Sequence, residues 1–320
     1  MTNLFNQLCS QIKKSNNILL IIHPNHDGDA VGSLCAFIDF LEKENKNYLA
    51  LAHENISQSF NFLNKINKIS IKASFSFNDF DTLIILDAPD EKRAGLKKID
   101  FPNENKPYKI IIDHHHNLKP QADIHICDTD SSSTSEIIYD FFKHINFNYD
   151  KHTATALLCG LATDTENFSN DITQPGSLKK ASHLIKRGAN LNLITKKIFL
   201  TKDFNSLKFL GNILSHLNYN PKHKIVSTTI TSADLVNYGL KENDLDKIGT
   251  SNFLKNIKEA EIILVLKETL AGKIKGSLRS NKLNIEPLAR ALGGGGHTKA
   301  AGFVIEGNLI KTGDGKWKVK

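Results

Sequence analysis

The sequence contains few cysteines and no C-x-x-C pair. Its four cysteines, Cys9, Cys35, Cys127 and Cys159, are spread over a chain of 320 residues. This usage argues against a disulfide framework and against a zinc knuckle, and it is typical of reduced thiols in a cytosolic protein.

A signal peptide and a membrane-spanning run are also missing. The N-terminal stretch MTNLFNQLCSQIKKSNN has no basic start, long apolar core or small-residue cleavage site. No apolar run approaches the roughly 20 residues that a membrane helix needs. Internal repeats and low-complexity tracts are absent as well. We therefore expect a soluble, cytoplasmic protein with no membrane partner.

A large charge of one sign is absent too. The 41 Lys and Arg exceed the 34 Asp and Glu only slightly, which gives a net charge of +7. This excess favours an anionic partner without naming it, and the scattered lysines are more typical of a solvated surface than of a nucleic-acid-binding stripe. The length of 320 residues and the hydrophobic content of 40% predict two domains with ordinary packed cores.

The first half of the chain alternates between apolar runs of strand length and helical patterns. We expect strands at 18–22, 48–52, 81–87 and 108–113, and helices at 3–14, 30–41, 135–142 and 153–162. The alternation predicts an α/β fold with a mostly parallel sheet. In such a sheet the carboxyl ends of the strands form the ligand-binding edge.

A helical stretch and a smaller α/β unit follow. Helical patterns fill 178–215 with a break at Gly188, and later patterns predict strands at 223–230, 261–267, 273–279 and 300–305 and a helix at 285–292. We therefore expect an N-terminal domain at 1–185, a helical connector at 186–215 and a C-terminal α/β domain at 216–320.

The most informative stretch is HPNHDGDAVGS at 23–33, which follows the apolar run at 18–22 directly. It places His23, Asp27 and Asp29 in an H-x-x-x-D-x-D pattern at the end of a strand. Two close carboxylates repel each other unless a cation neutralises them or one of them binds a proton. Three ligand-type side chains at this position therefore predict a cation site.

Four more groups join this constellation, namely Asp87, His114, His115 and Asp164. An aspartate that follows a strand is, by itself, usually a turn residue or a helix cap. A domain rarely directs this many carboxylates to one edge without a cation, however. We therefore interpret the set as one metal centre.

The donor atoms of this centre are carboxylate oxygens and imidazole nitrogens, without thiolate. Such a set favours Mn²⁺ or Mg²⁺ over structural Zn²⁺. Four carboxylates carry a formal charge of about −4, which two divalent ions balance, so we expect two metals about 3.5–4 Å apart with one bridging carboxylate. A water between two such cations loses its proton easily and can attack a phosphate ester, whose oxygens can bind both ions.

Five motifs in order resemble those of the DHH phosphoesterase superfamily. They are HPNHDGDAVGS, LDAPDEKR, DHHHN, GLATDT, and GSLRS with GGGGHTKAAGF, the last resembling the DHH-associated C-terminal domain. The resemblance covers essentially the whole chain. The compact layout is similar to that of NrnA-type enzymes, which are oligoribonucleases (nanoRNases) and phosphatases of 3′-phosphoadenosine 5′-phosphate (pAp). It implies a Mn²⁺-dependent phosphodiesterase and phosphatase, with Mg²⁺ as the alternative ion.

The resemblance also implies a role for each residue of the N-terminal site. The first metal would be bound by His23 and Asp27, the second by Asp29, His114 and Asp164, and Asp87 would bridge the two. His115 would contact the substrate phosphate. Asp113 would orient neighbouring groups without binding a metal. We take His115 and Asp113 as candidate catalytic residues.

In the C-terminal domain the resemblance implies a phosphate-binding site. Arg279 and His297 would bind a substrate phosphate, beside Ser280. Arginine suits this role because its guanidinium group can make two parallel hydrogen bonds to phosphate. The backbone N–H groups of the glycine run, with Gly294, Gly295 and Gly296, would approach the phosphate closely because glycine has no side chain.

The sequence departs from the family pattern after the fourth motif. Related enzymes often read T-D-T-G-x-F-R, whereas this chain has Glu166 in place of the glycine and no arginine after Phe168. This weakens the transfer of a phosphate-binding arginine, and Asn167 or Asn170 stands as its substitute. His26 and His116 are additional to the pattern.

Three alternative functions stay open. The substrates could be linear or cyclic signalling dinucleotides, or longer single strands as in RecJ, although RecJ-type enzymes carry an added nucleic-acid-binding domain that this length does not accommodate. A catalytically idle nucleotide-binding module would have lost metal ligands, and here every ligand position is filled. Base preference, cleavage direction and a homodimeric state are not fixed by the sequence.

Overall fold

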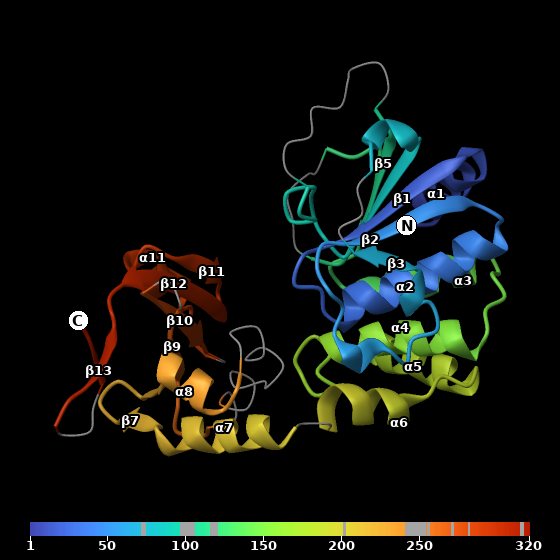
Figure 1. Cartoon of the computed structure of the whole chain (residues 1–320). Helices are drawn as coiled ribbons and strands as arrows, with labels where there is room; N and C mark the ends of the chain where they lie inside the picture. Colours follow the sequence, from blue (N-terminus) through green and yellow to red (C-terminus); the bar gives the residue numbers. More distant parts are fainter. Residues whose placement is uncertain are drawn as a thin grey trace. The chain divides into compact units, whose positions relative to one another are not determined.

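The computed structural model describes residues 1–71, 75–96, 106–115, 121–200, 203–240, 254, 257–269, 272–280, 282–313 and 317–320. The chain forms two compact units, Met1–Thr201 and Lys202–Lys320 (Figure 1). The division falls inside the connector predicted at 186–215. No described helix is long and apolar enough to cross a membrane.

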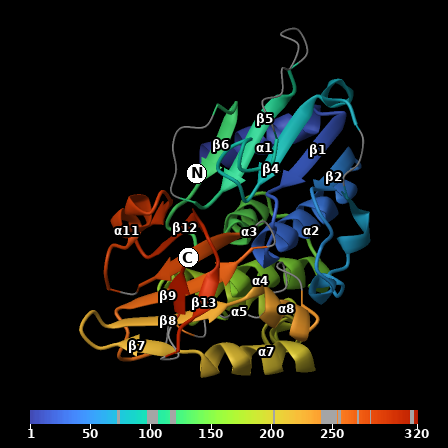
Figure 2. The same cartoon turned by 60° about the vertical axis from the view of Figure 1, so that its left-hand side comes forward.

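The first unit is built on a six-stranded parallel sheet. Its strands are β1 (Asn17–Ile22), β2 (Asn47–Ala52), β3 (Ile69–Ile71), β4 (Thr82–Leu86), β5 (Tyr108–Asp113) and β6 (Ile124–Cys127). Their order is β3-β2-β1-β4-β5-β6, and Figure 2 shows β6, β5, β4, β1 and β2 side by side. The strand order reverses between β1 and β4, which is where open parallel sheets bind ligands. The predicted α/β fold with a mostly parallel sheet is confirmed.

Helices cover one face of this sheet. They are α1 (Thr2–Lys14), α2 (Gly28–Lys43), α3 (Thr134–His144), α4 (Lys151–Asp164), α5 (Pro175–Lys186) and α6 (Leu191–Ile194), followed by a π-helical turn at Thr195–Leu200. Figure 1 shows α2, α3, α4 and α5 in layers beside the sheet. Short 3₁₀ turns lie at Gln58–Phe60, Ile66–Lys68 and Phe77–Asp79.

The side chains of β1 alternate between two hydrophobic clusters. Ile18, Leu20 and Ile22 belong to the large cluster that contains the helices. Leu19 and Ile21 belong to a smaller cluster on the opposite face. This alternation follows from the twofold side-chain period of a strand and buries β1 on both faces, as expected for a central parallel strand.

The second unit contains a mixed sheet. Its elements are α7 (Phe204–Ser215), β7 (Asn218–Asn220), β8 (Ile225–Ile230), α8 (Ser232–Asn237), β9 (Ile262–Glu268), β10 (Lys273–Arg279), α11 (Glu286–Ala291), β11 (Gly295–His297), β12 (Ala300–Glu306), β13 (Leu309–Lys311) and β14 (Trp317–Val319). The main sheet has the order β11-β12-β10-β9-β8-β7. Only β8 and β9 pair in parallel among its described pairs.

Several short strands were not predicted from the sequence, namely β3, β6, β7, β11, β13 and β14. The run at 124–127 forms β6, the last strand of the parallel sheet, although its four residues are too few for periodicity to indicate a strand. The glycine run was among the segments without an expected strand, and Gly295–His297 pairs with β12 as the edge strand β11. The break at Gly188 is confirmed, because this residue ends the helical stretch with a φ of 89°.

Candidate metal centre

The predicted metal ligands come from the carboxyl edge of the sheet and from two helix ends. His23 follows β1, Asp87 follows β4 and His114 follows β5. Asp27 and Asp29 lie at the first turn of α2, and Asp164 is the last residue of α4. The edge predicted from the sequence is therefore the place where these side chains gather.

These side chains form three groups able to hold a metal ion. The groups are His23 with Asp27 and Asp87, Asp29 with His114 and Asp164, and Asp87 with His114 and His115. Within each group the ligand atoms lie within 4.8 Å of one another. The first two groups coincide with the two ligand sets that the family resemblance implies. That these residues bind metal stays a prediction.

Asp87 lies between the two sets. Its Oδ2 is 3.4 Å from His23 Nε2, and its Oδ1 is 3.7 Å from His114 Nε2. Each oxygen thus faces one set, as a bridging carboxylate requires. The backbone of Asp87 has a φ of 58°, a left-handed conformation that aspartate tolerates better than most residues.

The loop after β1 fixes His23 and Asp27. Nδ1 of His23 donates to the carbonyl oxygen of Pro24 at 2.8 Å. A carbonyl can only accept, so Nδ1 carries a proton, and in its neutral form, the form that binds a metal, the ring would present the lone pair of Nε2 to the centre. Asp27 caps α2, and its Oδ1 accepts from the backbone N–H groups of Asp29 and Ala30 at 2.9 and 3.1 Å.

The first turn of α3 holds the second set. Asp29 accepts from the backbone N–H groups of Thr134 at 2.6 Å and Ser135 at 2.9 Å, one to each carboxylate oxygen. The hydroxyl of Thr134 donates to Asp87 Oδ1 at 3.0 Å. Within the serine-rich run 131–135, Ser133 caps α3, because its Oγ accepts from the backbone N–H of Glu136. The contact of Thr134 with Asp87 was not predicted, because the sequence shows only a Ser/Thr-rich segment before a helix.

The carboxylates of the centre repel one another. Burial and the charge of Asp87 raise the pKa of Asp27, and they raise the pKa of Asp29 to about 7. Burial and the charges of Asp29 and Asp27 raise the pKa of Asp164 well above its usual range. These shifts show that the negative charge of the cluster is not fully compensated by the protein.

The pKa values of His23 and Asp87, in contrast, shift in the directions that favour the charged forms of both groups. Burial alone would lower the pKa of His23, but the hydrogen bond and charge of Asp87 raise it to about 9. Burial alone would raise the pKa of Asp87, but its contacts with His23 and His114 lower it. A divalent cation would replace the protons that this cluster otherwise holds. The oxygen and imidazole donors and the uncompensated charge therefore fit a hard divalent cation.

His115 lies at the margin of the centre. Its Nδ1 donates to Asp113 Oδ1 at 2.7 Å, and this hydrogen bond raises the pKa of His115. The side chain is 44% exposed, whereas Asp113 is buried. Asp113 therefore orients His115, as the resemblance implies, and the other ring nitrogen stays available to a substrate. His116 lies outside the described residues.

The loop after Asp164 retains a backbone that glycine would favour. Glu166, Asn167 and Phe168 have φ angles of 50°, 61° and 65°. Glu166 thus occupies, in a left-handed conformation, the position where related enzymes often have glycine. The side-chain amide of Asn170 donates to the carbonyl oxygen of Asp164 at 2.7 Å. Asn170 therefore anchors this loop, and the replacement of the missing arginine by Asn167 or Asn170 stays a prediction.

Two of the predicted phosphate-binding residues of the second unit, Arg279 and Ser280, make hydrogen bonds to the backbone. Arg279 ends β10, and its Nη1 donates to the carbonyl oxygen of Leu278. Ser280 is buried, and its hydroxyl donates to the carbonyl oxygen of Glu261 while accepting from the N–H of Leu283. The structure gives Ser280 a structural role, and its contact with substrate stays a prediction.

The glycine run also has a packing role. A Cβ at Gly294 would overlap the carbonyl oxygen of Gly302, and a Cβ at Gly296 would overlap that of Ala300. Close approach to β12 therefore accounts for these two glycines. A Cβ at Gly295 would meet nothing. Phosphate binding by this run and by His297, whose side chain lies outside the description, stays a prediction.

A pocket of about 420 Å³ lies elsewhere in the first unit, near the end of α3. Tyr139, Tyr149, His183 and Arg187 are among its lining residues. It contains none of the predicted site residues. The chemistry of the donor groups, rather than the presence of a cavity, identifies the candidate site.

Family models match both units. The model described as the DHH family, N-terminal domain, matches residues 17–161. The model described as the DHHA1 domain matches residues 228–313. The two matched segments lie one in each compact unit.

Similar proteins match over nearly the full chain. An uncharacterized protein of Mycoplasma genitalium, MG371, is 27% identical over 92% of this chain and 89% of its own length. The bifunctional oligoribonuclease and PAP phosphatase NrnA of Bacillus subtilis is 26% identical over 93% of this chain and 92% of its own length. The crystal structure of an exopolyphosphatase-related protein from Bacteroides fragilis has a TM-score of 0.86 at 23% identity, covering 95% of this chain and 91% of that one. The first two likenesses span both units, and the third shows that the fold is shared.

Proposed function

Because the chain carries a DHH-family N-terminal domain followed by a DHHA1 domain, we propose that it is a metal-dependent phosphoesterase acting on short oligonucleotides and on pAp. The oligonucleotides would be hydrolysed to mononucleotides, and pAp would lose its 3′-phosphate to give AMP. The observation that carries the proposal is the pair of donor sets that meet at the two oxygens of Asp87.

The residues of the centre would have separate roles in phosphate ester hydrolysis. Two divalent cations, Mn²⁺ in our proposal, would supply the positive charge that lowers the pKa of an attacking water and offsets the charge of the phosphate. His23, Asp27 and Asp87 would hold one ion, and Asp29, His114, Asp164 and Asp87 the other. The negative charge of these carboxylates would offset the positive charge of the two ions.

His115 would contact the substrate phosphate. Its Nδ1 proton is committed to Asp113, so the ring orientation is fixed before substrate binds. The raised pKa of His115, caused first by this hydrogen bond, favours the protonated ring. A protonated ring can donate from its other nitrogen to a phosphate oxygen, as a charge-assisted hydrogen bond.

The choice of substrate rests on the similar proteins and on charge. The similar enzyme of Bacillus subtilis is a bifunctional oligoribonuclease and PAP phosphatase. The net charge of +7 favours anionic substrates. We infer that Arg279 and His297 of the DHHA1 domain bind a phosphate of the substrate, with the backbone of the run Gly293–Gly296 nearby.

A substrate panel tests this proposal. Di- to pentanucleotides, pAp, cyclic dinucleotides and a single strand of about twenty nucleotides would be incubated with the metal-loaded protein, and the products separated by chromatography. We expect mononucleotides from the short oligonucleotides, AMP from pAp, and much slower cleavage of the long strand. Preferred turnover of cyclic dinucleotides or of the long strand would contradict the proposed substrate class and leave the hydrolytic chemistry intact.

A further inference from the structure

The two ligand sets of the centre are held by different parts of the chain. His23 and Asp27 depend on contacts within their own loop, namely the carbonyl of Pro24 and the backbone N–H groups at the start of α2. Each of these contacts spans three residues or fewer. His23 Nδ1 and Asp27 are therefore held by neighbouring residues, and Asp87 is the member of the first set that comes from a distant element.

The second set depends on α3, which lies far away in the sequence. Asp29 receives two hydrogen bonds from Thr134 and Ser135, across 105 and 106 positions of the chain. Thr134 also donates its hydroxyl to Asp87 Oδ1, the oxygen that faces His114. Both partners of this hydroxyl bond are buried, with Thr134 0% and Asp87 2% exposed. One helix turn thus holds two carboxylates on the same side of the centre.

A buried network in turn fixes the start of α3. Oε2 of Glu136 accepts from the backbone N–H and the hydroxyl of Ser132 and from the hydroxyl of Ser177, at 3.0, 2.6 and 2.9 Å. Lys180 neutralises the same carboxylate through Oε1 at 2.8 Å. Because Glu136 lies on α3 and its partners lie on the segment before α3 and on α5, these contacts restrain the first turn of α3. Thr134 therefore presents its hydroxyl from a rigid position.

We propose that Thr134 is a positioning residue that sets the affinity of the second metal position and leaves that of the first nearly unchanged. The proposal rests on the metal centre proposed above. The hydroxyl of Thr134 orients Oδ1 of Asp87 toward His114, and without it that oxygen can rotate away from the second set. Oδ2 belongs to the same rigid carboxylate and turns with Oδ1, but it keeps a partner of its own in His23 Nε2 at 3.4 Å, so we expect the first metal position to be affected less. The affinities of the two metal positions can thus be changed separately by substitution.

The test is a pair of substitutions with calorimetric titration of Mn²⁺ into metal-stripped protein. Thr134→Val keeps the shape of the side chain and removes the hydroxyl, and Thr134→Ser keeps the hydroxyl. We expect Thr134→Val to weaken one binding step about 10–100-fold, the usual effect of losing a partner of a metal ligand, and to change the other step less than about threefold. Thr134→Ser should restore both steps.

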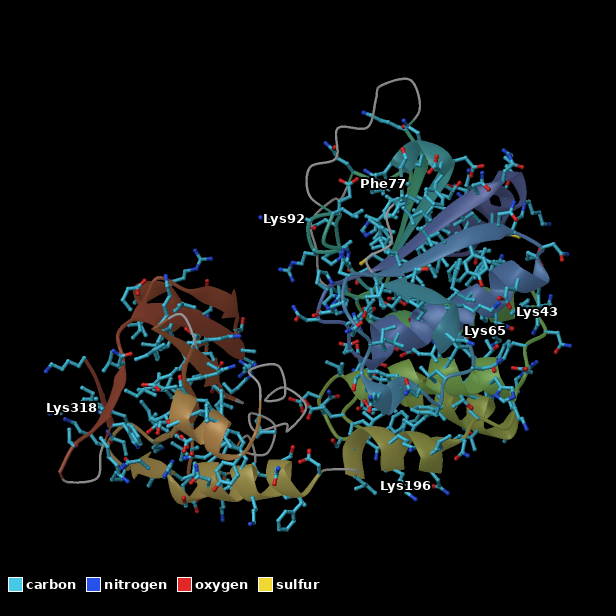
Figure 3. The ribbon with its side chains drawn as sticks, in the orientation of Figure 1. Lys43, Lys65, Phe77, Lys92, Lys196 and Lys318 are labelled. Carbon is cyan, nitrogen blue, oxygen red and sulfur yellow. The ribbon has the colours of Figure 1, made fainter. Side chains whose placement is uncertain are left out.

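Thr153→Val is the matched control. Thr153 is buried on α4 and donates to the buried carboxylate of Asp39 at 2.8 Å. Asp39 pairs with Lys43 and Lys65, both labelled in Figure 3, and belongs to none of the three donor groups. This variant loses the same kind of hydrogen bond outside the centre. It should lower the melting temperature of the metal-free protein by a similar amount as Thr134→Val while leaving both binding steps intact.

The outcomes separate this inference from the proposed function. Equal weakening of both steps in Thr134→Val, or wild-type affinities for both, would overturn the positioning role while the metal centre stands. A wild-type protein that binds no divalent ion would overturn the metal centre itself. A loss of one step in Thr153→Val as well would show that any buried threonine has this effect, and would also overturn the inference.

Discussion

At the scale of single residues, Asp87 is the point where the two halves of the centre meet. Its two oxygens face different ligand sets, and its left-handed backbone places it directly after β4. The strand end and the neighbouring motifs were enough to single out Asp87 from the sequence as a candidate bridging ligand. The hydrogen bond from Thr134 to Asp87 could not be predicted, because it spans 47 positions of the chain and depends on how α3 packs.

Asp87→Asn should abolish most of the activity without unfolding the protein. Asparagine tolerates the same left-handed backbone, so the fold is kept, while one charged oxygen is lost from the bridge. We expect dinucleotide hydrolysis to fall by on the order of 10²–10³-fold or more, as when a group that stabilises transition-state charge is removed. Initial rates at saturating Mn²⁺ measure this effect.

Asp90→Asn is the control for this substitution. Asp90 lies three residues further along the same loop, and its Oδ1 accepts only a backbone bond from Arg93 among its described contacts. Its loss should leave the rate within about twofold of the wild type, since a surface cap contributes to stability and not to the centre. Wild-type turnover by Asp87→Asn would rule out the bridging role.

At the scale of elements, the centre is built by close packing of α2, α3 and α4. A Cβ at Gly32 would overlap the carbonyl oxygen of Ala156, and a Cβ at Gly160 would overlap Ser135 Oγ and Asp29 Oδ1. The elements themselves were predicted well where apolar periodicity is long, as for α2 and β1. Short elements such as β6 were missed, and the approach of α4 to Asp29 cannot be read from a sequence because it results from tertiary packing.

Gly160→Ala should therefore damage both stability and metal binding. The added methyl group has no room between α4, Ser135 and Asp29, so one of them must shift. We expect a loss of about 1–3 kcal/mol in the free energy of unfolding, as for overpacking of a well-packed core. The displaced Asp29 should also weaken Mn²⁺ binding in the same calorimetric titration.

Gly211→Ala provides the matched control. Gly211 lies within α7, and a Cβ there would meet nothing within 4 Å. Alanine is favoured over glycine inside a helix by roughly 0.5–1 kcal/mol, so this variant should be slightly more stable. Equal destabilisation by both substitutions in chemical denaturation would contradict the packing argument.

At the scale of the whole molecule, the charges of the centre connect metal binding, proton binding and folding. In the metal-free protein Asp29, with a pKa raised to about 7 by burial and Asp87, costs stability once it ionises. His23, with a pKa raised to about 9 by Asp87 against the effect of burial, contributes stability below its ordinary pKa and loses it as the pH rises through 9. Both effects act in the same direction.

The metal-free protein should therefore become less stable as the pH rises from about 5 to about 9. Divalent ions should reverse this trend, because they replace the protons of the cluster and bind more tightly when those protons are gone. Melting temperatures measured across this range, with EDTA and with Mn²⁺, check the prediction. A melting temperature in EDTA that rises through this range would contradict it.

The order of the motifs is visible in the sequence, which predicts a domain at 1–185, a connector at 186–215 and a domain at 216–320. The alternation of strand and helix patterns gives way to helical patterns at 178–215. The motifs that resemble the DHH-associated C-terminal domain, GSLRS and GGGGHTKAAGF, begin at 276 and 293. The observed boundary, between Thr201 and Lys202, lies within the helical stretch. Periodicity could not locate it there, since helices on both sides of the boundary have the same kind of pattern.

The most direct test of the whole account is one titration. Metal-stripped protein would receive increasing Mn²⁺ in the presence of a dinucleotide, and bound manganese and released mononucleotide would be measured in the same samples. A two-metal mechanism predicts no hydrolysis in EDTA and a rise in hydrolysis that follows the binding of a second ion per chain. Full hydrolysis without divalent ions, or two bound ions with no hydrolysis of any short oligonucleotide, would contradict it.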